Sequence, residues 1–256
     1  MKTQKRVKEW FDNEALWRET YLHVFPESRM AIAPETVDKV LKLTGVQGKS
    51  ALDLCCGTGR CSLALANLGF SVTGVDRTKF FLDKARAKAR AAHLKIEWIR
   101  KDMRDFVRPD SFDLALSMFT SFGYFDNRGE DAMVIANVFK SLRRGSAFVM
   151  DVMGKEITAK VFRDSSIETL PDGATLVEKR RVIDDWTRIA NEWTIIRKGR
   201  VMRFEFNLNV YSGQELRELF ERAGFVDVKL YGNMDGAPYG YTANRLIVVG
   251  WKSKKP

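Results

Sequence analysis

A glycine-rich loop at residues 53–59, with the sequence DLCCGTG, constrains the fold of this chain more than any other segment. It begins within the end of a segment at 51–54 that predicts a short buried strand, and it precedes a segment at 61–68 that predicts a helix. Glycine lets the backbone turn sharply and approach a ligand closely. The start of a helix also offers backbone amides that have no partner within the helix. The loop therefore predicts a ligand site where a sheet strand ends and a helix begins.

The residues of the loop discriminate among ligands. A phosphate-binding P-loop ends in Gly-Lys-Ser/Thr, which this loop does not. A dinucleotide fingerprint has the pattern G-x-G-x-x-G, and here Gly57 and Gly59 are followed by Ser62 at the third position. The carboxylate of Asp53 would repel a pyrophosphate but attract an ammonium group, directly or through water. Taken alone the loop leaves a dinucleotide open, but it favours a ligand with an amino-acid group.

Two further carboxylates follow later predicted strands. Asp76 comes directly after an apolar segment at 70–75, and Asp102 follows another at 95–99. A carboxylate at the first position can accept hydrogen bonds from the two hydroxyls of a ribose, although a strand-end Asp can also cap a helix. A carboxylate at the second position can accept an adenine amino group, while Met103 covers the ring. Together with the loop, these residues predict a nucleoside site.

The pattern of apolar residues predicts an α/β fold with an insertion. Strand and helix segments alternate over residues 49–151, which is typical of a parallel sheet with helices on both faces. Residues 174–183 and 188–197 are rich in Val, Ile, Thr and Trp, and 201–210 alternates apolar with polar residues, so a small antiparallel sheet is expected there. The α/β pattern then resumes with a capping box at Ser212.

We therefore expect a Rossmann-like, seven-stranded, mostly parallel sheet with helices on both faces and an antiparallel β insertion after the fifth strand. The predicted divisions are an N-terminal helical lid, a main domain in two parts and an inserted subdomain: residues 1–48, residues 49–154 with 211–256, and residues 155–210.

Composition limits the classes of partner. The net charge is +10, and much of it lies in residues 1–10 and 252–256. Solvated basic tails are the simpler interpretation, and RNA binding is the alternative. The first ten residues are not followed by an apolar run, so we expect a cytoplasmic protein without a secretory signal or a membrane partner. The three cysteines, at positions 55, 56 and 61, predict neither disulfides nor a metal site.

The loop, Asp76 and Asp102 together resemble the class I S-adenosylmethionine-dependent methyltransferases over residues 48–151. In that family the loop commonly begins Asp-x-Gly-Cys-Gly, whereas Cys55 replaces the first glycine here. A narrower resemblance rests on SMFTSFGYF at 117–125, Asp151-Val152 and DGAPY at 235–239. These segments look like a bacterial subgroup of small-molecule methyltransferases, similar in layout to sugar-amine N-methyltransferases.

The resemblance implies S-adenosylmethionine as cofactor and a set of donor-binding residues: Tyr21, Arg29, Asp53, Cys55, Gly57, Gly59, Asp76, Arg77, Asp102, Met103, Met118 and Phe119. Acceptor contacts should come from beyond the carboxyl ends of the strands. The candidates are Ser121, Phe122, Tyr124, Tyr239 and Arg245. Tyr124 could orient the acceptor or a proton-relay water. His23, in the predicted lid, is the only histidine placed where it could act as a base.

Because the sulfonium is already a good methyl donor, the expected reaction is an in-line displacement at the methyl carbon by a nitrogen or oxygen atom of a small molecule, with the sulfur as leaving group. Two alternatives stay open. One is an RNA methyltransferase, and the other is a protein that binds S-adenosylmethionine without catalysis. The inserted sheet is also a candidate surface for a homodimer.

Overall fold

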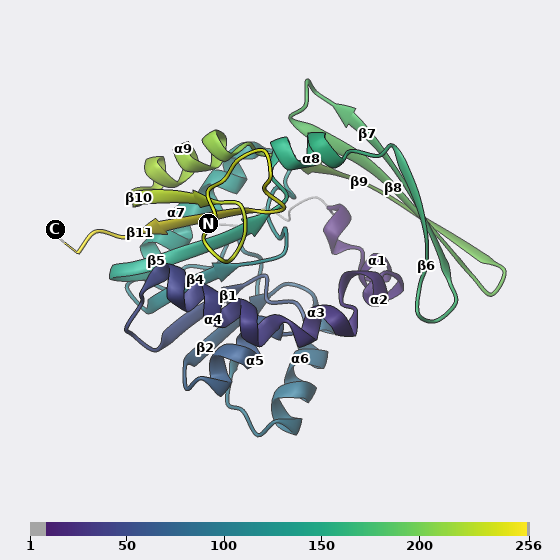
Figure 1. Ribbon diagram of the computed structural model, residues 1–256. Helices are drawn as coiled ribbons and strands as arrows, with labels where there is room; N and C mark the ends of the chain where they lie inside the picture. Colours follow the sequence, from purple (N-terminus) through teal and green to yellow (C-terminus); the bar gives the residue numbers. More distant parts are fainter. Residues whose placement is uncertain (1–8, 255–256) are drawn as a thin grey trace, which may run out of the picture.

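The computed structural model describes residues 9–254 and contains two β-sheets that stand side by side (Figure 1). The larger has seven strands in the order β10-β11-β5-β4-β1-β2-β3, and the smaller has four in the order β6-β7-β8-β9. In the larger sheet β11 runs antiparallel to both β5 and β10, and the other pairs are parallel. The predicted fold, with its insertion after the fifth strand, is confirmed.

The inner strands of the larger sheet are mostly buried, whereas the edge strands β3 and β10 are largely exposed or half-buried. Their bounds are β1 Ser50–Leu54, β2 Ser71–Asp76, β3 Glu97–Arg100, β4 Phe112–Ser117, β5 Leu142–Val152, β10 Val226–Tyr231 and β11 Leu246–Trp251.

Helices cover both faces of this sheet, and each face has its own apolar core. On one face α4 (Ala33–Thr44) and α5 (Arg60–Asn67) pack against Ala51, Leu114 and Val149. On the other, α7 (Arg128–Ser141) and α9 (Gly213–Ala223) pack against alternate strand residues such as Leu52 and Phe148. The remaining large helix, α6 (Lys79–Ala91), contacts β2 and β3. Successive side chains of a strand point to opposite faces of the sheet, and helices cover both faces. Residues at successive positions are therefore apolar, and the strands appear in the sequence as continuous apolar segments.

The inserted sheet follows α8 (Lys155–Val161) and is antiparallel throughout. Its strands are β6 Ser165–Thr169, β7 Thr175–Ile183, β8 Arg188–Arg197 and β9 Arg200–Asn209. The last three were expected from the sequence. β6 was not, because it is an edge strand whose residues are mostly exposed, so it has no apolar pattern.

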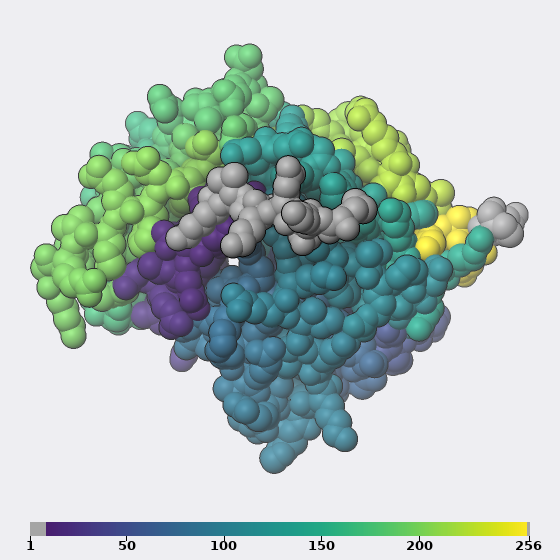
Figure 2. Space-filling model, turned by 180° about the vertical axis from the view of Figure 1, so that it is seen from behind, coloured from purple at the N-terminus to yellow at the C-terminus, as the bar shows by residue number. Residues whose placement is uncertain are grey.

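The predicted lid divides into two parts with different roles. Helix α4 belongs to the core of the main domain, since Val37 and Val40 are fully buried. The preceding segment, formed by η1 (Trp10–Asp12), α1 (Glu14–Glu19), α2 (Tyr21–Val24) and α3 (Glu27–Ala31), lies between the two sheets (Figures 1 and 2). We call residues 9–31 the bridging segment. Residues 1–8 of the predicted lid lie outside the described part of the chain.

Contacts on both sides hold the bridging segment in place. The ring of Trp10 stacks on Phe206 of the inserted sheet, with centroids 4.7 Å apart, and also lies 4.9 Å from the ring of Tyr124 in the main domain. Glu19 pairs with Arg197 of β8. The segment therefore closes the space between the main domain and the insertion.

Candidate functional site

The glycine-rich loop adopts the sharp turn that its sequence predicts. Gly57 and Gly59 have φ values of +55° and +80°, and Cys55 has a φ of +59°. A residue with a side chain in this left-handed region costs about 1–2 kcal/mol relative to an ordinary conformation. The structure thus accommodates a cysteine where the resembling family commonly has glycine. A Cβ on Gly57 would lie 2.6 Å from the ring of Phe25, so the bridging segment packs directly on the loop.

Asp53 and Asp76 are buried carboxylates on either side of this loop. Asp53 is 3% exposed and accepts a hydrogen bond from Ser62 Oγ at 2.5 Å, and burial raises its pKa to about 6. The two oxygens of Asp76 accept hydrogen bonds from the backbone amides of Gly57 at 2.9 Å and Thr78 at 2.8 Å. Burial raises the pKa of Asp76 as well. Both side chains are therefore held in one orientation by hydrogen bonds.

Asp102 belongs to a buried ion cluster around Arg104, which is 3% exposed. Arg104 donates from Nη2 to Asp102 at 2.8 Å, and it also pairs with Glu9 and Glu130 at 2.5 and 3.1 Å. Burial alone would raise the pKa of Asp102, but the hydrogen bonds and charge of Arg104 hold it below its usual value. The cluster fixes the end of β3 to the bridging segment through Glu9.

Two small cavities lie along the carboxyl edge of the sheet beneath the bridging segment. The first, of about 60 Å³, is lined by Asp76, Asp102 and Met103 among others. The second, of about 80 Å³, is lined by Asp53, Met118 and Phe119 among others. Trp17, Cys55 and Tyr124 line both, so the two cavities are neighbours. Their order along the sheet matches a ligand with a nucleoside at one end and an amino-acid group at the other.

The loop after β4 forms the far wall of the second cavity and is strained. Phe119 and Thr120 both have left-handed backbones, with φ values of +60° and +63°. Asp151 holds them, since its carboxylate accepts from Phe119 N at 3.1 Å and its carbonyl from Thr120 N at 2.8 Å. Arg245 donates to both Asp151 and Thr120, at 2.7 and 2.9 Å. Strain of this kind persists only where the surroundings fix it, and it clusters at functional sites.

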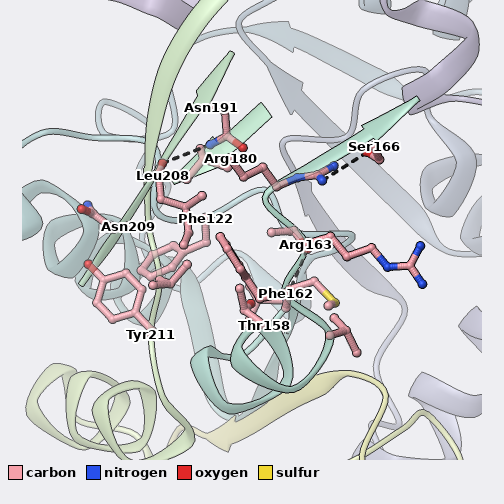
Figure 3. A pocket seen from close by; sticks show the side chains of 16 residues that line it. Phe122, Thr158, Phe162, Arg163, Ser166, Arg180, Asn191, Leu208, Asn209 and Tyr211 are labelled. Atoms are coloured by element: carbon pink, nitrogen blue, oxygen red, sulfur yellow. Dashed lines mark hydrogen bonds between the residues drawn. The ribbon is translucent and has the colours of Figure 1, made fainter. Parts of the chain in front are cut away.

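A third and larger cavity, of about 500 Å³, lies between this loop, α8 and the inserted sheet (Figure 3). Its lining is mainly apolar and includes Phe122, Phe162, Ile189 and Leu208. Thr120 lines this cavity, whereas its neighbours Phe119 and Ser121 line the second one. One strained loop thus separates the two spaces.

Most of the predicted donor-binding residues lie around the first two cavities. Those that line them are Asp53, Cys55, Asp76, Arg77, Asp102, Met103, Met118 and Phe119, together with the predicted acceptor residues Ser121 and Tyr124. Gly57 and Gly59 belong to the adjacent turn. Arg77 pairs with Asp12 of the bridging segment and lies over the ring of Phe11. Phe122 lines the third cavity instead.

Besides Gly57 and Gly59, five predicted residues line none of these three cavities, and one of them, Arg245, instead holds the loop after β4 from behind through Asp151 and Thr120. Tyr21 stacks on Phe25, and the exposed Arg29 donates to the carbonyl of Val24. His23 Nδ1 lies 2.8 Å from Glu168 of the inserted sheet, with its ring edge-on to Trp193. Tyr239 donates to Glu156 Oε2 at 2.7 Å, beside the start of α8. Of the two predicted catalytic residues, Tyr124 therefore lines the first two cavities and His23 does not.

Several residues at the site were not predicted. Phe11 and Phe25 line the cavities from the bridging segment, and Arg60 lines the second one from the start of α5. Only Arg60 left a signal in the sequence, because it directly follows the glycine-rich loop. The aromatic residues of the bridging segment reach the site only through the tertiary fold.

Two features are absent from the described residues, a metal-binding cluster and a membrane-spanning helix. Between residues 9 and 254 no three His, Cys, Asp or Glu side chains are grouped so that they could hold a metal ion. No helix in that range has the length and apolar character needed to cross a bilayer.

The class I fold of proteins that bind S-adenosylmethionine is defined by a seven-stranded sheet with this order, a glycine-rich turn after β1, and carboxylates in β1, at the end of β2 and after β3. Comparison with known proteins agrees. Residues 51–145 match the family model described as a methyltransferase domain. YqeM of Bacillus subtilis (strain 168), named as a methyltransferase, is 33% identical over 79% of this chain and 84% of its own length. The chain therefore belongs to the S-adenosylmethionine-dependent methyltransferases, and S-adenosylmethionine is its methyl donor.

Solved structures share the fold across nearly the whole chain. An S-adenosylmethionine-dependent methyltransferase from Clostridium acetobutylicum aligns with a TM-score of 0.77 at 14% identity, covering 95% of this chain and 99% of that one. The sugar N-methyltransferase KedS8 from Streptoalloteichus aligns with a TM-score of 0.67 at 20% identity, covering 99% and 96%. At these identities the likeness is one of fold.

Proposed function

We propose that this enzyme transfers the methyl group of S-adenosylmethionine to a nitrogen or oxygen atom of a small molecule held in the third cavity. The observation that carries the proposal is the loop after β4. Its residues Met118, Phe119 and Ser121 line the donor side, while Thr120 and Phe122 line the third cavity. For the accepting atom to reach the methyl group directly, this strained turn would have to shift when the acceptor binds.

The size and lining of the third cavity favour a small, mainly apolar acceptor with a polar group. Its volume of about 500 Å³ falls within the range typical of small-molecule sites. Asn209, 5% exposed, lines the cavity, and its Oδ1 accepts no hydrogen bond from any residue between 9 and 254. A buried acceptor atom without a partner is costly, so an amine or hydroxyl of the bound molecule is its natural partner.

The side chains around the donor supply position more than proton transfer. Burial raises the pKa of Tyr124 well above its usual value, so its hydroxyl stays protonated and can donate a hydrogen bond at neutral pH. In this proposal the Tyr124 hydroxyl orients the acceptor. The imidazole of His23, the predicted base, contacts Glu168 and Trp193 at the inserted sheet and does not line the cavities that Tyr124 lines. The bound sulfonium supplies the reactive methyl group without a strong base.

Filling the third cavity tests the acceptor assignment. We expect Leu208→Trp to abolish methyl transfer to the small-molecule fraction of a cell extract. The affinity for S-adenosylhomocysteine, measured by calorimetry, should stay within about threefold of wild type. Arg203→Trp, on the same strand but with a side chain that is 60% exposed, is the matched control and should retain transfer. Full activity of Leu208→Trp would place the acceptor elsewhere.

We also propose that the enzyme works in the cytoplasm and that two copies associate through the inserted sheet. The edge strands β6 and β9 carry exposed apolar residues, Ile167 at 74% and Val201 at 65%. The two residues lie on opposite edges of the four-stranded sheet, and an exposed edge strand can pair with a strand of a second copy. Small-angle scattering that gives the mass of a monomer at all protein concentrations would contradict the dimer.

A further inference from the structure

Arg60 is a buried arginine whose charge the described chain leaves without a hydrogen-bonded carboxylate. It begins α5 directly after the glycine-rich loop and is 8% exposed. Its guanidinium carbon lies 3.5 Å from the centroid of the Phe119 ring and 5.3 Å from that of Phe25. The two rings hold the guanidinium plane in the wall of the second cavity, which Arg60 lines together with Asp53.

The nearby carboxylates are engaged by other groups. Asp53 accepts its short hydrogen bond from Ser62, and the carboxylate of Asp151 is bound by Arg245 and by the amide of Phe119. Within residues 9–254, Nη1 of Arg60 is inaccessible to solvent and has no hydrogen-bond partner. A buried charge is normally paired, because removal from water is expensive otherwise. The site is therefore built for an anion that comes with a ligand.

The shape of the guanidinium indicates which anion. Arginine presents parallel N–H groups that match a carboxylate in bidentate fashion. The amino-acid end of S-adenosylmethionine carries one carboxylate and one ammonium group. Asp53, in the same cavity, has the charge that suits the ammonium.

We propose that Arg60 binds the carboxylate of the methyl donor, opposite Asp53 at its ammonium group. Arg29, which the sequence suggested for donor binding, is exposed and bound to the carbonyl of Val24. The proposal concerns the donor alone and stands whether or not the third cavity holds the acceptor.

A pair of ligands that differ by one carboxylate tests the proposal. Calorimetry would compare S-adenosylmethionine with decarboxylated S-adenosylmethionine on the full chain. In Arg60→Gln we expect affinity for S-adenosylmethionine to fall about 30-fold, as expected for the loss of charge-assisted hydrogen bonds. Affinity for the decarboxylated ligand should change by less than about threefold, because that ligand never makes the contact. Arg90→Gln, on the exposed side of α6, is the matched control for the loss of one positive charge.

Other outcomes would overturn the assignment. An equal loss of affinity for both ligands would mean that Arg60 acts through packing alone. A second contrary result is that Arg29→Gln loses the preference for S-adenosylmethionine over the decarboxylated ligand while Arg60→Gln keeps it. That result would assign the carboxylate to Arg29. If Arg60→Gln fails to fold, Arg60→Lys keeps the charge but not the bidentate geometry. It should retain only part of the preference, and a full preference would contradict bidentate binding.

Discussion

Donor binding should depend on pH through Asp53. This carboxylate is 3% exposed, and its pKa is raised from 3.8 to about 6 by burial. Below pH 6 it is protonated and cannot pair with the ammonium group of the donor. If only the ionised form binds, the apparent dissociation constant rises about twofold at pH 6 and about elevenfold at pH 5, relative to pH 8.

The same shift predicts how the stability of the ligand-free enzyme changes. The native pKa of Asp53 lies above its unfolded value, so the native state holds the proton more tightly. The resulting stabilisation is complete below pH 4 and is lost as pH rises through about 6. The difference between 3.8 and about 6 corresponds to about 3 kcal/mol. Donor binding and stability should therefore change in opposite directions over this range.

Calorimetric titration of S-adenosylhomocysteine between pH 5 and 8 measures how the dissociation constant changes with pH. The variant Asp53→Asn shows how much of that change is due to Asp53. The pKa of Asp76 is raised by burial too, so part of the pH dependence should persist in the variant. We expect Asp53→Asn to bind more weakly at pH 8 and to show a clearly flatter profile. Equal profiles for both proteins, or wild-type affinity that is constant from pH 5 to 8, would refute the pairing.

Three further substitutions test other parts of the site. Asp76→Asn should weaken S-adenosylhomocysteine binding about 100-fold, since a carboxylate acceptor for two hydroxyls is lost; unchanged calorimetric affinity would contradict the assignment. Arg245→Ala should lower the turnover rate at least about tenfold by releasing the strained loop, with donor affinity preserved; steady-state kinetics at wild-type rates would argue against this role. Arg104→Met should cost about 3 kcal/mol in urea unfolding, because the carboxylates of its ion cluster lose their shared partner; a loss below about 1 kcal/mol would contradict a structural role for the cluster.

Local sequence patterns predicted the main architecture because they report local physics. The glycines of the loop, the apolar runs of buried strands and the capping box at Ser212 each act within a few residues, and all appear in the structure. The sequence did not predict that β5 begins as early as Leu142. Its second and third residues are the polar pair Arg143 and Arg144, which break the apolar pattern. Edge strand β6 was missed for the same reason, as most of its residues face solvent.

The site itself was only partly predictable. Strand ends pointed to Asp53, Asp76 and Asp102, because parallel strands bring their carboxyl ends to one edge. The bridging segment reaches that edge through contacts between residues far apart in the chain, such as Trp10 with Phe206. No pattern within the segment distinguishes the residues that face the cavities from those, like Tyr21, that face away.

The most direct test of the account follows the methyl group itself. The enzyme would be incubated with methyl-labelled S-adenosylmethionine and, separately, with the small-molecule fraction and the RNA fraction of a cell extract. We predict label in a small molecule, attached to nitrogen or oxygen, and none in RNA. Label in RNA alone, or donor binding without transfer to either fraction, would contradict the proposed function.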